Sequence, residues 1–250
     1  MTSSFIIRFH SARHDNLAQL LRFMDLWHEN TINQAELITV CQDKFDKKIN
    51  SEKWASHKHF DLNLIEMNLA YMTNFAVHQT TNEKLVMLDG DRILPAKYFD
   101  YVIPRLRKGM QFTTRKILKL TRPHDDQMIS DNTINSNCEF RSEQEGKNMW
   151  SGNTIFMKSD FLNAGGMDEL YVGYGFEDND MTQATQKYGT ISIYREKESE
   201  IHLWHEPLTY GVAEPKEMYI KNAVRFCKKW SKPLPENVRQ DMLDNRKFII

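Results

Sequence analysis

The chain has 250 residues, of which 40% are hydrophobic and 27% are charged, a composition typical of a globular protein with a sizeable core. This length suits one large domain, which we expect to extend over residues 1–250. The net charge of −1 argues against a nucleic-acid-binding protein, because such proteins usually carry a marked basic excess.

The cysteines and the apolar segments indicate the compartment. Cys41, Cys138 and Cys227 are far apart and lack CxxC spacing, which argues against a disulfide framework and against a thiolate metal site. No apolar run approaches the ~18 residues that a membrane-spanning helix needs, and the N-terminal run ends at Arg8. We therefore expect a cytoplasmic protein without a transmembrane segment. Basic residues between 105 and 122 leave peripheral contact with an anionic surface open, although a solvated face is the simpler explanation.

Strand and helix patterns alternate in the first part of the chain. Residues 4–9 (SFIIRF), 35–43 (AELITVCQD) and 84–91 (KLVMLDGD) have the character of strands. Apolar residues at helical spacing predict helices at 17–27 and 62–77. This alternation predicts βαβ units and a single Rossmann-like α/β domain, with a central, mostly parallel sheet flanked by helices.

The later part of the chain is less regular. Residues 121–148 are polar and without periodicity, as in a functional loop, and we predict a mobile lid on the acceptor side there. A strand and a short helix follow, and we expect Ser159 to cap this helix and Gly165 to end it in the left-handed conformation. We divide the domain into a nucleotide-binding half (1–95), an acceptor and catalytic half (96–213) and a helical C-terminal extension (214–250).

The stretch VMLDGDRILP places two aspartates, Asp89 and Asp91, at the end of a predicted strand. In an extended backbone both carboxylates point to the same side, and Gly90 between them leaves room for a ligand. Such oxygens suit Mg²⁺ or Mn²⁺, which keep coordination positions open for phosphate oxygens. An Asp-Gly turn with a spare acid explains this short motif equally well. Asp43 follows another strand and should lie at the same sheet edge, where ligands bind.

A second motif, GGMDELYVGYGFEDND at 165–180, combines glycines, aromatic residues and acids. The glycines permit a close approach of the backbone or a positive φ. Flat faces for stacking a sugar ring come from three aromatic side chains: Tyr171, Tyr174 and Phe176. The acids Glu177 and Asp178 fall in the first turn of the next helix, where the helix dipole alone would favour them.

A third motif, IHLWHEP, contains His202 and His205. A histidine is more often structural than a metal ligand, and HxxH matches no zinc spacing strongly. Beside an aspartate pair, however, an imidazole can complete a carboxylate–histidine metal site. The sequence leaves open whether His202 takes part.

In this order the three motifs resemble those of the GT-A fold nucleotide-sugar glycosyltransferases, in particular the β-galactosyltransferases and the chondroitin-polymerase-like enzymes. The C-terminal motif of that family runs roughly GGFDExFxGWGGEDxDLxxR, and this chain has GGMDELYVGYGFEDNDMTQA. DGDRILP is similar to the DxD strand end of the family, and HLWHEP to its metal-binding histidine segment. The likeness covers residues 5 to about 207. Two departures are Tyr174 in place of the usual Trp and Phe176 in place of a Gly.

The resemblance implies an inverting, metal-dependent transferase that moves a hexose or N-acetylhexosamine from a nucleotide sugar, by family default UDP-linked, to a hydroxyl of a glycan or glycolipid. Asp91 and His205 would hold Mn²⁺ or Mg²⁺, with Asp89 assisting the metal or the ribose. Asp178 would be the general base. The implied nucleotide and donor contacts are Arg8, Arg13, Asp43, Asn74, Asp89 and Gly152. The implied acceptor and sugar contacts are Trp150, Tyr174, Glu177 and Asp180.

Two other functions use the same residues. The chain could be a nucleotide-sugar or carbohydrate-binding module that kept the fold without turnover, and Phe176 in place of glycine favours this alternative. It could also be a metal-dependent phosphohydrolase that directs the same acids at water.

Overall fold

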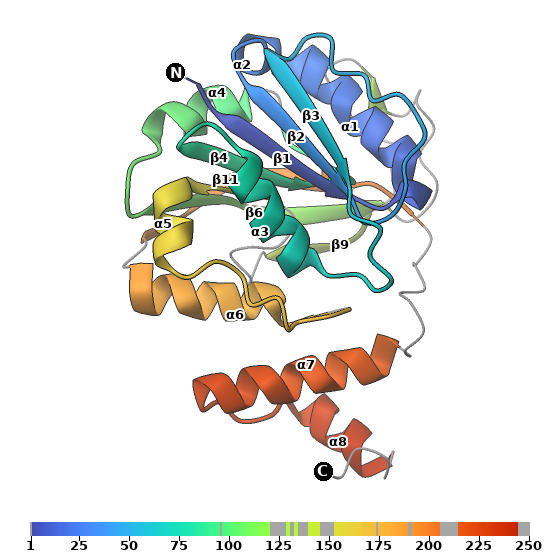
Figure 1. Cartoon of the computed structure of the whole chain (residues 1–250), viewed down its shortest axis with the longest axis vertical. Helices are drawn as coiled ribbons and strands as arrows, with labels where there is room; N and C mark the ends of the chain where they lie inside the picture. Colours follow the sequence, from blue (N-terminus) through green and yellow to red (C-terminus); the bar gives the residue numbers. More distant parts are fainter. Residues whose placement is uncertain are drawn as a thin grey trace.

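The computed structural model describes residues 2–95, 97–120, 129–130, 133–134, 140–145, 153–173, 175–189, 192–205 and 215–244. Within these ranges the centre of the molecule is a nine-stranded sheet with the order β3, β2, β1, β4, β10, β6, β11, β5, and β9 pairs with β6 (Figure 1). The strands are β1 (Ser4–Phe9), β2 (Glu36–Cys41), β3 (Ser56–Asp61), β4 (Lys84–Asp89), β5 (Arg92–Ile93), β6 (Met110–Leu120), β9 (Phe140–Glu145), β10 (Asn153–Met157) and β11 (Ser192–His202). Two short strands, β7 (Ile129–Ser130) and β8 (Thr133–Ile134), pair with each other. The predicted α/β fold with a central sheet and flanking helices is confirmed.

The sheet is parallel in its N-terminal part and mixed elsewhere. β3, β2, β1 and β4 run parallel to one another. β10 runs antiparallel to β4 and β6, whereas β11 is parallel to β6. The carboxyl ends of β1, β2 and β4 therefore lie at one edge, which is where open α/β sheets bind ligands.

Helices cover both faces of the sheet because the strand side chains alternate and are apolar on both sides. Phe5 and Ile7 of β1 pack with α1 (His14–Trp27), α2 (Glu29–Ile32) and α4 (Tyr98–Val102). Ile6 packs on the other face with α3 (Leu69–Gln79), α5 (Lys158–Asn163) and α6 (Glu177–Ala184). Short turns complete these layers: η1 (Ser11–Arg13), η2 (Ile103–Arg105) and the π-helical turn η3 (Thr185–Gly189).

Two further helices, α7 (Pro215–Trp230) and α8 (Glu236–Asp244), form the C-terminal part of the described chain. Figure 1 shows α7 beyond α6, at the end of the molecule away from the sheet. The Asn222 side chain of α7 donates a hydrogen bond of 3.0 Å to the carbonyl of Val172, so α7 is tied to the loop before α6. None of the helices in the described ranges has the length and apolar character that crossing a membrane requires.

The predicted helix over residues 62–77 is wrong over residues 62–68. The preceding residues 56–61 form β3, and α3 begins only at Leu69, after the Asn68 side chain accepts a hydrogen bond from the Tyr71 amide. Ile65, which supplied part of the apolar stripe, is 85% exposed. A capping side chain therefore sets the start of this helix more strongly than the apolar spacing does.

Two other expectations need correction. Ser159 does not cap α5: Met157 occupies the N-cap position without a side-chain bond, and the Ser159 amide donates to Glu83. Gly165 does adopt the predicted left-handed conformation, with φ of 93°.

The predicted mobile lid over residues 121–148 is wrong in part, because residues 140–145 form β9 and pair with β6 in the sheet. The rest of the predicted lid lies largely outside the described residues.

Candidate active site

The buried Arg8 organises the carboxyl end of β1. Its Nη1 atom donates a hydrogen bond of 2.7 Å to the hydroxyl of Thr73, and its Nη2 atom forms an ion pair with Asp89. Arg8 and Asp89 are also opposite each other in the β1–β4 register. Asp89, which we expected to assist the metal, thus has a charged partner within the protein fold.

Asp91 lies in a cluster that could hold a metal ion. The Oδ2 atom of Asp91 lies 3.5 Å from Nε2 of His202 and 3.3 Å from Nε2 of His205. The two Nε2 atoms are 3.1 Å apart. Ligand atoms of these three residues lie within 4.8 Å of one another, the only such group in the described ranges. The structure therefore joins the predicted Asp91 and His205 and adds His202, whereas Asp89 is not in this group.

Strand pairing brings the cluster together. β5 follows Asp91 directly and pairs with the end of β11, so that Arg92 is opposite His202. The Leu203 amide donates to the Asp91 carbonyl at 2.8 Å. We expected Gly90 to leave room for a ligand, but the structure gives a different reason for glycine. A Cβ atom at this position would lie only 2.8 Å from the Cβ of Phe9. These contacts fix the Asp91 side chain against β11.

The protonation of the cluster suits a metal site, because metal ligands must be free of protons. Burial lowers the pKa of His202, so this imidazole is neutral at pH 7. Burial alone would raise the pKa of Asp91, but hydrogen bonds from His202 and His205 lower it well below its usual range. Arg13 donates to the same carboxylate at 2.7 Å. One carboxylate and two imidazoles form a mixed oxygen and nitrogen site that could hold a divalent transition-metal ion.

A cleft lined by Asp91 contains three of the six predicted nucleotide and donor contacts, Arg8, Arg13 and Asp89. Its lining residues are Arg8, Phe9, His10, Arg13, Gln42, Met67, Leu69, Met72, Asp89, Gly90 and Asp91. Asp43 lies beside it and accepts a hydrogen bond of 2.9 Å from the Ser11 amide, with its other oxygen bonded to the Ser11 hydroxyl. Burial would raise the pKa of Asp43, but these bonds lower it overall, so the carboxylate is charged. Nucleotide binding by Arg8, Arg13 and Asp43 stays a prediction.

Two acids with raised pKa values begin α6. Burial raises the pKa of Glu177 to about 8, and repulsion from Asp178 adds to this. Burial also raises the pKa of Asp178, to about 6, while the charges of Arg8 and Arg92 oppose the rise. At neutral pH Glu177 therefore keeps its proton and Asp178 is mainly ionised. The charges of Arg8, Asp89 and Arg92 act on the pKa of Asp178, so Asp178 lies near the strand end that carries Asp91.

Asp180, a predicted acceptor contact, is buried and bonded within the protein. Its buried carboxylate accepts hydrogen bonds from the Tyr171 hydroxyl (3.1 Å), Trp230 Nε1 (2.6 Å) and Lys229 Nζ (2.8 Å). Tyr171 is itself buried and offers no face to a sugar ring. These contacts make Asp180 an anchor for α7.

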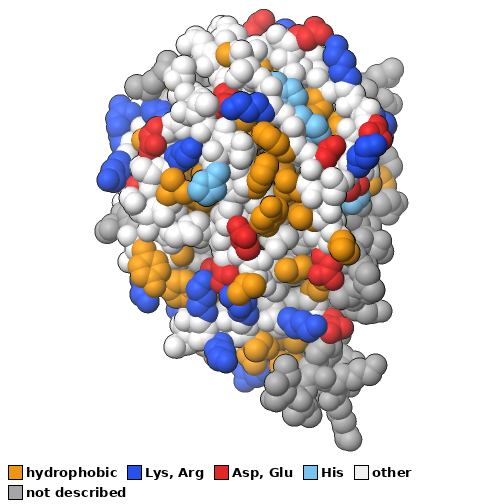
Figure 2. Space-filling model, viewed as in Figure 1, with side chains coloured by type: hydrophobic (Ala, Val, Ile, Leu, Met, Phe, Trp, Pro, Cys, Tyr) orange, Lys and Arg blue, Asp and Glu red, His pale blue; other side chains and the backbone are white. Residues whose placement is uncertain are grey.

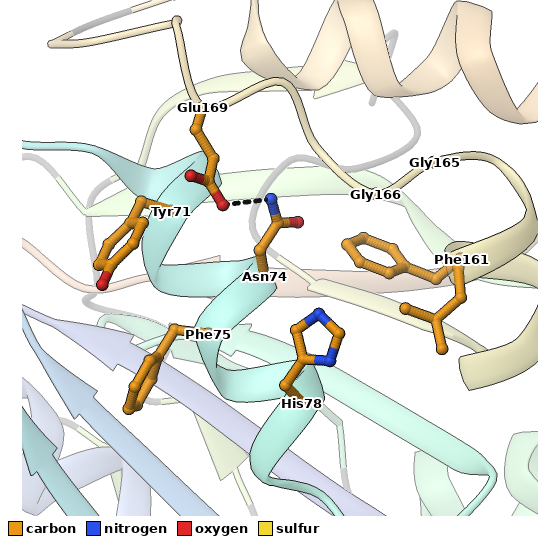
Figure 3. A pocket seen from close by; sticks show the side chains of 9 residues that line it. Tyr71, Asn74, Phe75, His78, Phe161, Gly165, Gly166 and Glu169 are labelled. Carbon is orange, nitrogen blue, oxygen red and sulfur yellow. Dashed lines mark hydrogen bonds between the residues drawn. The ribbon is translucent and has the colours of Figure 1, made fainter.

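Asn74, a predicted donor contact, does not line the donor cleft. Its amide donates at 2.8 Å to the Met167 carbonyl and at 2.8 Å to Glu169, and the Met167 amide donates back to it. It lines a separate cavity of about 310 Å³ with Tyr71, Phe75 and His78 on one face of α3 (Figure 3). In Figure 2 hydrophobic side chains gather on this face of the molecule, near α3. Asn74 thus joins α3 to the loop that follows Gly165 and Gly166.

Three predicted site residues, Trp150, Gly152 and Tyr174, lie outside the described residues. Sequence reasoning missed Arg92 and Glu200, which form a buried ion pair of 2.8 Å beneath the cluster. Burial raises the pKa of Glu200 to about 7, although Arg92 and Thr114 oppose this. An isolated glutamate within an otherwise ordinary strand gives no sequence signal for such a role.

Comparison with known proteins identifies the fold of this chain. Residues 133–206 match the family model described as the N-terminal domain of galactosyltransferase, and this range contains both the acid motif and the two histidines. The crystal structure of GalNAc-T7 with UDP, GalNAc and Mn²⁺ is similar over 98% of this chain, with a TM-score of 0.61 and 12% identity. This chain has the GT-A fold of the nucleotide-sugar glycosyltransferases. The resemblance seen in the sequence motifs is confirmed.

Other structures with the GT-A fold are also similar. Drosophila β1,4-galactosyltransferase 7 in complex with xylobiose matches over 87% of this chain and 79% of its own, with a TM-score of 0.54 and 15% identity. S. aureus TarS matches over 100% of this chain and 44% of its own, with a TM-score of 0.59 and 13% identity. The chain therefore spans only about half the length of these two structures, 54% of GalNAc-T7 and 44% of TarS. No curated protein matches the sequence.

Proposed function

We propose that this GT-A chain is a metal-dependent, inverting glycosyltransferase that moves a hexose or N-acetylhexosamine from a UDP-sugar to a hydroxyl of a glycan or glycolipid. The observation that carries the proposal is the joint position of two groups at one sheet edge. Asp91, His202 and His205 gather there, and Asp178, with a pKa raised to about 6, interacts with the neighbouring Asp89 and Arg92.

The metal would be held by Asp91, His202 and His205. Two imidazoles among three ligands favour Mn²⁺ over Mg²⁺, because Mg²⁺ prefers oxygen ligands. Bound there, the ion would supply positive charge to the departing diphosphate. Arg13 contacts the same carboxylate at 2.7 Å, and its remaining donors can bind a phosphate oxygen. GalNAc-T7, which shares the fold, was crystallised with UDP and Mn²⁺.

Asp178 takes the proton of the acceptor hydroxyl in this proposal. A base is most effective when its pKa lies near the working pH, and about 6 satisfies this condition. Glu177 retains its proton and so contributes no second negative charge beside the attacking oxygen. Arg8 and Arg92 keep Asp178 ionised despite its burial. Attack from the face opposite the leaving diphosphate would invert the anomeric carbon.

Several finer assignments stay proposals. The N-terminal half, 1–95, would bind the nucleotide, because Arg8, Arg13 and Asp91 line the cleft. Residues 96–213 would supply Asp178 and the two histidines, and 214–250 would support them. A cytoplasmic location and a contact with a membrane surface rest on the sequence alone.

An incubation of the protein with Mn²⁺, a panel of UDP-sugars and glycan acceptors tests the function. We expect UDP release that depends on an added acceptor and on the metal. Release of UMP and sugar phosphate without an acceptor would instead indicate a phosphohydrolase, because such an enzyme directs water at a phosphorus atom. Binding of UDP and Mn²⁺ in calorimetry without any release would indicate the binding module that Phe176 in place of glycine favours.

A further inference from the structure

The backbone just before the two acids has an unusual conformation. Phe176 adopts the left-handed conformation with φ of 72° and forms the N-cap of α6, without a side-chain capping bond. A bulky residue rarely has a positive φ, because its Cβ atom collides with the neighbouring carbonyl. Glycine adopts this conformation freely. The motif of the glycosyltransferase family that this chain resembles has a glycine at the position of Phe176. Something must therefore hold Phe176 in place.

Two aromatic side chains of α7 contact Phe176. The ring centroids of Tyr219 and Phe226 lie 5.2 Å and 5.4 Å from that of Phe176. Tyr219 and Phe226 are seven residues apart, or two helical turns, so both lie on one face of α7. Phe176 and Tyr219 also pack against Ile220 and Val238, the buried apolar residues between α7 and α8.

The loop before Phe176 is shaped for this helix. A Cβ atom on Gly173 would lie 2.2 Å from Met218 Sδ, and one on Gly175 would lie 2.7 Å from the Tyr219 ring. The close backbone approach that we expected from these glycines is thus an approach to α7. After the acids, Asp180 binds Trp230 and Lys229 of α7.

We propose that α7 is a positioning helix for the two acids that begin α6, Glu177 and the proposed base Asp178. Tyr219 and Phe226 hold Phe176 in its left-handed conformation and thereby fix the first turn of α6, which carries Glu177 and Asp178. The proposal deepens the proposed function, on which its kinetic part rests. It also gives a role to residues 214–250, for which the family motif offers no counterpart.

Hydrogen exchange combined with a rescue variant tests the proposal without requiring activity. In Tyr219→Ala/Phe226→Ala, the amides of residues 177–180 should exchange about tenfold faster, an energy of ~1.4 kcal/mol that matches the left-handed penalty of a non-glycine residue. Adding Phe176→Gly should restore slow exchange, because glycine needs no support at positive φ. Arg225→Ala is the control: it removes an ion pair of 2.8 Å between α7 and Asp168 in which Phe176 takes no part, so Phe176→Gly should not rescue it.

The kinetic part uses the same variants. Tyr219→Ala/Phe226→Ala should lower kcat about tenfold with the KM of the donor within about twofold, and Phe176→Gly should restore kcat. Unchanged exchange at 177–180 in the double variant, or a defect that Phe176→Gly does not relieve, would overturn the proposal. A wild-type protein that transfers no sugar would overturn the proposed function, while the exchange data would still decide whether α7 holds this turn.

Discussion

Replacement of Asp178 by asparagine distinguishes two roles for this residue, a catalytic base and an acid that only stabilises the helix end. Burial raises the pKa of Asp178 from 3.8 to about 6. At 1.36 kcal/mol per pH unit, keeping this carboxylate ionised costs the folded protein about 3 kcal/mol at pH 7. Asp178→Asn removes that cost and should raise the free energy of unfolding by about 2–3 kcal/mol. An acid that only supports the helix end predicts a loss of about 1 kcal/mol instead.

The effect on activity should be opposite in sign. Loss of a general base lowers kcat by roughly 10² to 10⁴-fold, whereas donor and metal affinity should hardly change because other residues form that site. In the wild-type protein, kcat should rise with pH and level off above about pH 6, since only the ionised Asp178 accepts a proton. The variant should lose this rise.

Glu177→Gln is the matched control. With its pKa raised to about 8, Glu177 is protonated at pH 7, and glutamine resembles that neutral form. We expect a rate within about fivefold of the wild type. The assay is acceptor-dependent UDP release from pH 5 to 8, combined with urea unfolding of each variant. Near-normal transfer by Asp178→Asn, or abolished transfer by Glu177→Gln with donor binding intact, would refute the assignment of the base.

Three other predictions concern the metal, the C-terminal anchor and pH. Asp91→Ala and His202→Ala should each weaken Mn²⁺-dependent UDP binding by at least about tenfold in calorimetry, and an unchanged Mn²⁺ dependence would remove that residue from the metal site. Trp230→Phe should lower the free energy of unfolding in urea by about 1–3 kcal/mol, because the buried Asp180 loses a hydrogen bond of 2.6 Å; an unchanged value would deny the anchor role. The pKa of Glu200 is raised to about 7, so its stabilising contribution is complete below pH 4.5 and is lost as the pH rises through 7. Glu200→Gln should reduce this decline between pH 5 and 8, and an equally steep decline would contradict it.

The strands that reach the candidate site could be located from the chain alone. Short apolar runs with a polar residue at their end mark β1, β2 and β4, because a buried parallel strand must be apolar on both faces. The same logic places Asp43, Asp89 and Asp91 at one edge. The motif order from DGD to HLWHEP was sufficient to predict the GT-A fold.

The partners of these residues depended on contacts between distant segments. His202 joins Asp91 only because β5 pairs with β11, and Asp89 is paired with Arg8 because β1 and β4 are neighbours. Neither pairing leaves a periodic signal in the sequence, since each joins segments about 80 to 110 residues apart.

The glycine-rich acid motif shows the same limit. From the sequence, its glycines and aromatic rings are equally suited to a sugar and to a helix. In the structure Gly173, Gly175 and Phe176 pack against α7. The distinction between Asp178 and Glu177 as the base also depends on the fold, because the nearby charges of Arg8 and Arg92 keep Asp178 ionised while burial keeps Glu177 protonated.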